Sequence, residues 1–188
     1  MLGATAAYSH AEAVARQAFL ALMWALSYPG RVRQLPPSRF DEDDFMLLGR
    51  TLLDLETSYF CPDRSLAARL ARYGAKSRSV ASAAYVFLPR LDEAALALVS
   101  EVKLGTHALP DEGATLIIGC DLDAGDAPEI VCSGPGIEGQ ARVRIGGVPL
   151  AFWELRRQII RYPLGFDIFF VHRGRVVGFP RTTQAEVA

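Results

Sequence analysis

The segment Thr115-Leu-Ile-Ile-Gly-Cys120 is the feature that most constrains the fold, because it reads as apolar throughout. A short apolar run that contains β-branched residues is typical of a strand that is covered on both faces. Such a strand belongs to a sheet that lies between other layers of structure. The sequence therefore predicts a layered domain with a central sheet.

Further strands are expected where the apolar pattern changes to a period of two. They cover residues 85–88, 130–132 and 141–145, and a C-terminal hairpin, residues 166–171 and 175–179, turns through His172-Arg-Gly174.

Helical spacing predicts several helices, most of them in the first half of the chain. Ser9 and Glu12 form a capping box for the first helix, and Tyr28-Pro29-Gly30 ends it. The other helices are expected at about residues 41–56, 65–73, 93–99 and 150–162. Helices come first and strands with interspersed helices follow. This order predicts a single α/β or α+β domain over residues 1–188, with a mixed β-sheet flanked by helices.

The net charge of −1 argues against a nucleic-acid-binding protein, which usually has a clear basic excess. The charge is uneven along the chain, since residues 92–138 carry 10 acidic and 1 basic residue. Residues 139–188 carry 8 basic and 3 acidic residues. These segments could form complementary contacts within or between chains, or they could be an ordinary solvated surface.

The sequence indicates a soluble, cytoplasmic protein. The longest apolar run, residues 18–26, is too short to span a bilayer, and no signal peptide is recognisable. Cys61, Cys120 and Cys132 form no close pair, so neither a disulfide framework nor a zinc site is expected. Cys120 and Cys132 are expected to be buried strand residues.

The loop Gly134-Pro135-Gly136-Ile137-Glu138-Gly139 matches the letters of a dinucleotide-binding fingerprint. That fingerprint needs a helix after the loop, whereas a strand is expected here, and Pro135 removes one backbone donor. The main interpretation is a tight reversal between two strands in which the glycines adopt positive φ. A minor alternative is a backbone nest that holds an anion.

Pro180-Arg181-Thr182-Thr183 is expected to end the ordered sequence. Arg181 with the hydroxyls of Thr182 and Thr183 could clamp an anion or a carboxylate. A docking tail at a subunit interface is an equal alternative.

No catalytic centre, cofactor site or metal site can be assembled from the sequence. Lys76 and Lys103 lack the apolar surroundings of a Schiff-base lysine. His107, near acidic residues, is the best candidate for a general base, although an ordinary loop histidine is the stronger interpretation. His10 and His172 are interpreted as surface residues.

Six segments in this order resemble one family, the PhnH proteins, which are the H subunits of bacterial carbon–phosphorus lyase systems for phosphonate use. The matching segments are 19–30, 51–57, 105–115, 133–139, 162–167 and 179–183. The resemblance implies a fold like that of pyridoxal-phosphate-dependent transferases, without the cofactor. It also implies a homodimer that assembles with the G, I and J subunits and has no established activity of its own.

Two functions follow as hypotheses. The first is a non-catalytic subunit that helps to organise the phosphonate-cleaving complex. The alternative is an anion- or nucleotide-binding enzyme subunit that acts on a phosphonate or on its ribose-triphosphate conjugate, with the anion near Gly134–Gly139 or Arg181–Thr183.

Overall fold

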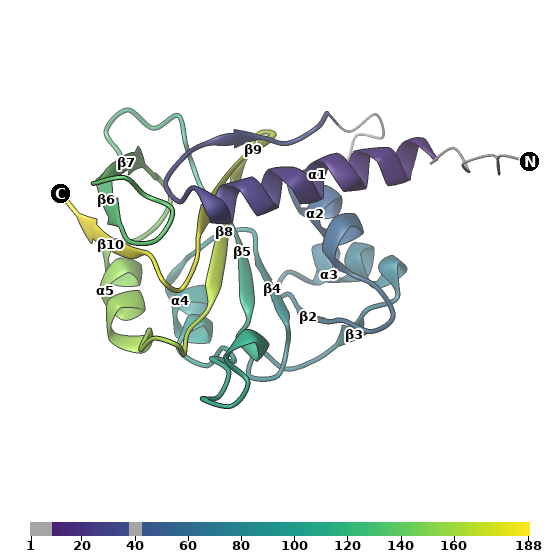
Figure 1. The fold of residues 1–188 in the computed structure, drawn as a ribbon. Helices are drawn as coiled ribbons and strands as arrows, with labels where there is room; N and C mark the ends of the chain where they lie inside the picture. Colours follow the sequence, from purple (N-terminus) through teal and green to yellow (C-terminus); the bar gives the residue numbers. More distant parts are fainter. Residues whose placement is uncertain (1–8, 38–42) are drawn as a thin grey trace, which may run out of the picture.

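A mixed seven-stranded sheet forms the centre of the protein (Figure 1), in the strand order β1-β9-β8-β5-β4-β2-β3. The structure, a computed structural model, describes residues 9–37 and 43–188. Strands β2, β3, β4, β5 and β8 are parallel, and β9 and β1 add an antiparallel edge. The strands are β1 (Arg33–Gln34), β2 (Ser58–Phe60), β3 (Lys76–Ser77), β4 (Tyr85–Leu88), β5 (Thr115–Gly119), β8 (Asp167–His172) and β9 (Arg175–Phe179).

Strand β5 confirms the expectation of a strand covered on both faces. It lies between β4 and β8, and Leu116, Ile117 and Ile118 are fully buried. Ile117 packs into one hydrophobic cluster, whereas Leu116 and Ile118 pack into the other. The apolar run therefore supplies both cores of a three-layer arrangement, and the predicted mixed sheet flanked by helices is confirmed.

Helices cover the two faces of this sheet. The face that receives Ile117 is covered by α1 (His10–Ser27), α2 (Asp44–Leu52) and α3 (Arg64–Leu70), whose buried side chains share its cluster. The other face is covered by α4 (Glu93–Val99), α5 (Leu150–Ile159) and a small second sheet. No helix in the described ranges is long and apolar enough to cross a membrane.

The second sheet is antiparallel, in the order β10-β6-β7, and consists of β6 (Glu129–Ser133), β7 (Ala141–Arg144) and β10 (Gln184–Val187). The expected reversal between β6 and β7 is confirmed. The expectation that order ends at Thr183 is wrong, because β10 continues the chain and pairs with β6. The alternation in Gln-Ala-Glu-Val places Ala185 in the core and leaves its neighbours exposed.

Most helix boundaries differ slightly from those expected. The capping box of Ser9 and Glu12 is present, with both reciprocal hydrogen bonds. Helix α2 begins at Asp44 with Asp43 as its N-cap, and residues 41 and 42 of the expected helix lie outside the described part of the chain. It ends at Leu52, and soon afterwards the Asp54 carboxylate accepts two backbone N–H groups in a turn. After α3, residues 71–73 form a 3₁₀ turn, and α5 ends at Ile159.

Candidate functional site

The two segments that the sequence singled out, the glycine loop and Arg181–Thr183, meet at one pocket. This pocket, here called the α5 pocket, has a volume of about 570 Å³. Its walls come from the glycine loop, the end of α5 and the segment that leads into β10. Its lining residues are Pro135, Arg156, Arg157, Ile160, Tyr162, Arg181, Thr182, Thr183, Gln184, Ala185 and Glu186.

The glycine loop is shaped by close backbone approaches. Gly134, Gly136 and Gly139 have φ of 125°, 81° and 68°, which confirms the predicted positive-φ reversal. The Ile137 N–H donates to the Gly134 carbonyl at 3.1 Å, as in a turn. A Cβ on Gly134 would lie 2.9 Å from the Thr182 carbonyl oxygen, so the loop packs directly against the Arg181–Thr183 segment. Anion binding by its backbone stays a prediction.

Arg181 is already engaged within the protein. Its Nη2 lies 2.8 Å from Oδ2 of Asp167, and its own backbone N–H donates to Oδ1 of the same carboxylate at 2.7 Å. The guanidinium also donates to the Pro110 carbonyl. These contacts neutralise the charge of Arg181 and fix the turn that carries Thr182 and Thr183. The arrangement favours a structural role for Arg181 over a free anion clamp.

Sequence reasoning missed Arg156, a buried cation in the wall of the α5 pocket. It is 4% exposed and donates to the Thr183 carbonyl at 2.9 Å and to the Pro180 carbonyl at 3.0 Å. Burial lowers the pKa of its guanidinium to about 10, so it remains charged at neutral pH. Its position four residues after the buried Phe152 was the available signal, because residues spaced by four lie on one face of a helix.

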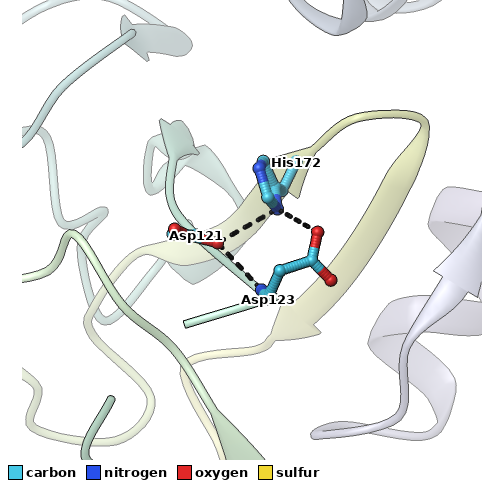
Figure 2. Close-up of side chains that lie close together, drawn as sticks. All are labelled: Asp121, Asp123 and His172. Carbon is cyan, nitrogen blue, oxygen red and sulfur yellow. Dashed lines mark hydrogen bonds and ion pairs between the residues drawn. The ribbon is translucent and has the colours of Figure 1, made fainter. Parts of the chain in front are cut away.

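A second constellation lies where the parallel strands end. Asp121 follows β5 and His172 closes β8, so the topology brings them together with Asp123 (Figure 2). His172 Nδ1 lies 3.5 Å from the Asp121 Oδ1 and 3.8 Å from the Asp123 Oδ2. The interpretation of His172 as a surface residue is wrong, because its side chain is only 15% exposed. We call these residues the carboxyl-edge cluster.

The contacts of the carboxyl-edge cluster include one ion pair, between Arg175 and Asp123, and a backbone hydrogen bond to His172. The Leu122 N–H donates to His172 Nδ1 at 3.0 Å and thereby occupies the lone pair that faces the carboxylates. Arg175 Nη2 lies 2.7 Å from Asp123, and this hydrogen bond lowers the pKa of the Asp123 carboxyl. A cation at this point would have to compete with Arg175 for Asp123 and with the Leu122 N–H for the imidazole.

The remaining candidates lie apart from the α5 pocket. Lys76 is exposed on the short strand β3, and Lys103 forms an ion pair with Glu112 at 2.8 Å. His107 is exposed in the loop before β5, and His10 is exposed at the start of α1.

The expectation of a buried strand residue is confirmed for Cys132 and is wrong for Cys120. Cys132 is fully buried in β6, whereas Cys120 is half-buried just after β5. Desolvation raises the pKa of the Cys120 thiol to about 12 and that of the Cys132 thiol to about 11. Neither thiol is activated as a nucleophile.

Helix α1 carries an apolar face that the protein leaves exposed. Phe19, Leu20, Met23, Trp24 and Tyr28, here called the α1 face, are each 37–48% exposed. Their spacing places them on the side of the helix that points away from its buried residues, and Figure 1 shows α1 along the outside of the molecule. Trp24 stacks on Tyr28 with ring centroids 5.5 Å apart.

Comparison with known proteins matches this chain to one family along nearly its whole length. The family described as "Bacterial phosphonate metabolism protein (PhnH)" matches residues 6–186. A relative from Stutzerimonas stutzeri, named as the C-P lyase subunit protein HtxG, is 32% identical over 169 residues, which cover 89% of this chain and 83% of the relative.

A second relative, from Rhizobium meliloti (strain 1021), is named alpha-D-ribose 1-methylphosphonate 5-triphosphate synthase subunit PhnH. It is 33% identical over 89 residues, which cover 46% of this chain and 43% of the relative. The match of the family across residues 6–186 confirms the resemblance found in the sequence, and the chain belongs to the PhnH family of bacterial phosphonate metabolism proteins.

Proposed function

We propose that this protein is a non-catalytic subunit of a cytoplasmic carbon–phosphorus lyase complex, in which it forms a homodimer and binds the G, I and J subunits. Membership of the PhnH family and the subunit names of both relatives support this role. The exposed α1 face is the single structural observation that carries it.

The α1 face has the composition and continuity of a protein interface. Its five side chains include three aromatic rings and a methionine, which are the residue types enriched at interface centres. The guanidinium groups of Arg31 and Arg33 lie 5.6 and 5.5 Å from the Tyr28 ring, so cations border the apolar surface. A contiguous apolar patch bordered by polar groups typically marks a site of protein association.

The other exposed apolar residues in the described ranges include a pair that lines one small pocket, Leu150 and Val187, and Tyr162, which lines the α5 pocket. Leu55 and Leu109 lie in separate loops, and Leu150 starts α5. Single exposed leucines are normal on protein surfaces. The contrast favours α1 as the assembly surface.

We infer the lack of catalytic activity from the ion pairs and the raised thiol pKa of the side chains that could otherwise react. Lys103 is ion-paired, Arg181 is neutralised by Asp167, and Cys120 has a raised pKa.

We also propose that the layered sheet is the fold of pyridoxal-phosphate-dependent transferases without the cofactor. The exposed position of Lys76 and the ion pair of Lys103 are consistent with that proposal.

Co-purification tests this role directly. The chain is co-expressed with tagged G, I and J subunits, either as wild type, as Trp24→Glu or as the matched control Leu55→Glu. We expect the wild type and Leu55→Glu to co-purify and Trp24→Glu to be lost, because a charge cannot be buried in an apolar interface without a large cost. Equal recovery of all three, or phosphonate turnover by the isolated chain, would refute the proposal.

A second candidate function is an anion- or nucleotide-binding enzyme subunit that acts on a phosphonate or on its ribose-triphosphate conjugate. One observation favours it, namely the buried and charged Arg156 in the wall of the α5 pocket. Titration of the isolated chain with ATP or methylphosphonate tests it, and an absence of saturable binding would exclude it.

A further inference from the structure

The guanidinium of Arg156 is a buried charge that forms no direct ion pair, although the charge of Asp167 acts on it and favours its charged form. Its two hydrogen bonds go to neutral carbonyl groups, and it forms no ion pair with any carboxylate in the described ranges. Desolvating a charge costs several kcal/mol, so buried cations in proteins are usually paired with an anion. The other two arginines of the α5 pocket each have a carboxylate partner, since the largely buried Arg181 pairs with Asp167 and the exposed Arg157 pairs with Glu154.

Two polar atoms beside this charge also lack partners. Nε of Arg156 and Oγ1 of Thr183 are buried and form no hydrogen bond. Both residues line the α5 pocket, and they are neighbours, because Arg156 Nη1 donates to the Thr183 carbonyl at 2.9 Å. A guanidinium has five N–H donors, of which the two carbonyls take two. The wall of the pocket therefore combines a cation that has no direct ion pair with a hydroxyl that has no hydrogen-bond partner.

The rest of the pocket suits a small molecule with an apolar part. Ile160, Pro135 and the largely exposed Tyr162 contribute apolar surface. Glu186 is exposed in β10, where solvent screens its charge more strongly than that of the buried Arg156. The volume of about 570 Å³ lies within the usual range of ligand pockets, about 300–1,000 Å³.

We propose that the α5 pocket binds a phosphorylated or phosphonate small molecule through its tetrahedral oxyanion, with Arg156 as the charge partner and Thr183 as a hydrogen-bond donor. An oxyanion of this kind accepts several hydrogen bonds at once. Nε of Arg156 and Oγ1 of Thr183 are buried, so both side chains would have to turn toward the pocket to donate to the ligand. The proposal names the ligand and residues for the second candidate function, and it is independent of assembly through the α1 face.

Isothermal titration of the purified chain tests the proposal with three phosphorus-containing probes, inorganic phosphate, methylphosphonate and ATP, and with acetate for comparison. We expect saturable binding of at least one phosphorus probe and none of acetate. Tighter binding of ATP than of phosphate would assign the apolar surface to a nucleoside, and tighter binding of methylphosphonate would assign it to a free phosphonate. Absence of binding by all three, or equal binding of acetate, would overturn the proposal.

Two variants locate the binding. Arg156→Gln should weaken binding by about 100-fold, and Thr183→Val, which keeps the shape of the side chain, by about 10-fold. Thr183→Val removes an unpaired buried hydroxyl and should fold at least as well as the wild type, so it serves even if Arg156→Gln does not fold. Arg161→Gln, in an exposed residue outside the lining, is the matched control.

Unchanged affinity in the Thr183→Val variant would refute the assigned donor. Co-purification with the other subunits should persist in all three variants, so a failure of ligand binding is distinguishable from a failure of the subunit role.

Discussion

Replacement of Trp24 by alanine should weaken subunit assembly while leaving the fold intact. Trp24 is 48% exposed, and an aromatic residue has about 150–250 Å² of surface, so roughly 100 Å² is free to be buried by a partner. At about 25 cal/mol per Å², this area corresponds to ~2.5 kcal/mol. A loss of that size raises the dissociation constant roughly 70-fold.

The free energy of unfolding should change by only about 1 kcal/mol or less, because a half-exposed ring contributes little to the core. The lost stacking on Tyr28 is included in this figure. The contrast between a large effect on association and a small effect on folding is the signature of an interface residue.

Two measurements check this contrast. Titration against the other assembled subunits gives the dissociation constant, and urea denaturation of the isolated chain gives the stability. Sedimentation velocity of the isolated chain reports whether the same residue supports the homodimer. Leu55→Ala is the matched control, since Leu55 is 75% exposed but lies outside the α1 face. Equal dissociation constants for the wild type and Trp24→Ala would refute the assignment of α1 as the assembly surface.

Three further predictions concern packing and titration. Gly178→Ala should reduce the stability by about 1–3 kcal/mol, because its Cβ would lie 2.5 Å from the backbone carbon of Ala25; a wild-type urea midpoint would contradict this. Native Cys120 should react with iodoacetamide far more slowly than in the unfolded chain, because burial raises its pKa to about 12, and equal rates would contradict this. Burial raises the pKa of Asp44 above 3.8 in the folded protein, so the folded state binds this proton more tightly than the unfolded chain does. The free energy of unfolding should therefore fall as the pH rises above 3.8. Asp44→Asn keeps an oxygen acceptor for the Gly174 N–H but cannot ionise, so its free energy of unfolding should not show this decrease in urea titrations from about pH 4 to 7. The same pH dependence in the variant and the wild type would contradict the prediction.

The sequence predicted those elements whose pattern is long enough to read. Strand β5 and helix α1 were recognised because an apolar run and a capping box are strong local signals. Strands β1 and β3 contain only two residues each, and no periodicity can be read from two residues. Strand β10 does alternate, but its pairing with β6 depends on a contact across more than fifty residues of chain, which local pattern does not reveal.

In the candidate site, too, the local segments could be predicted from the sequence, whereas the contacts between distant segments could not. The sequence identified Arg181–Thr183 and the glycine loop but could not show that they share a pocket, because the contact depends on the pairing of β10. Arg156 was overlooked because arginine usually indicates the exposed face of a helix. The carboxyl-edge cluster could have been predicted, since Asp121 follows β5, His172 is the last residue of β8, and these two strands are parallel neighbours.

The glycine loop packs against both the end of α1, which carries the α1 face, and the wall of the α5 pocket. A Cβ on Gly136 would lie 2.2 Å from the Ser27 carbonyl oxygen, at the end of α1, and one on Gly134 would lie 2.9 Å from the Thr182 carbonyl oxygen, beside the α5 pocket. Both approaches are made to backbone atoms, which cannot move aside as a flexible side chain can. Close packing therefore accounts for Gly134 and Gly136, and the positive φ of 68° accounts for Gly139, so the resemblance of this loop to a nucleotide-binding motif has a structural explanation.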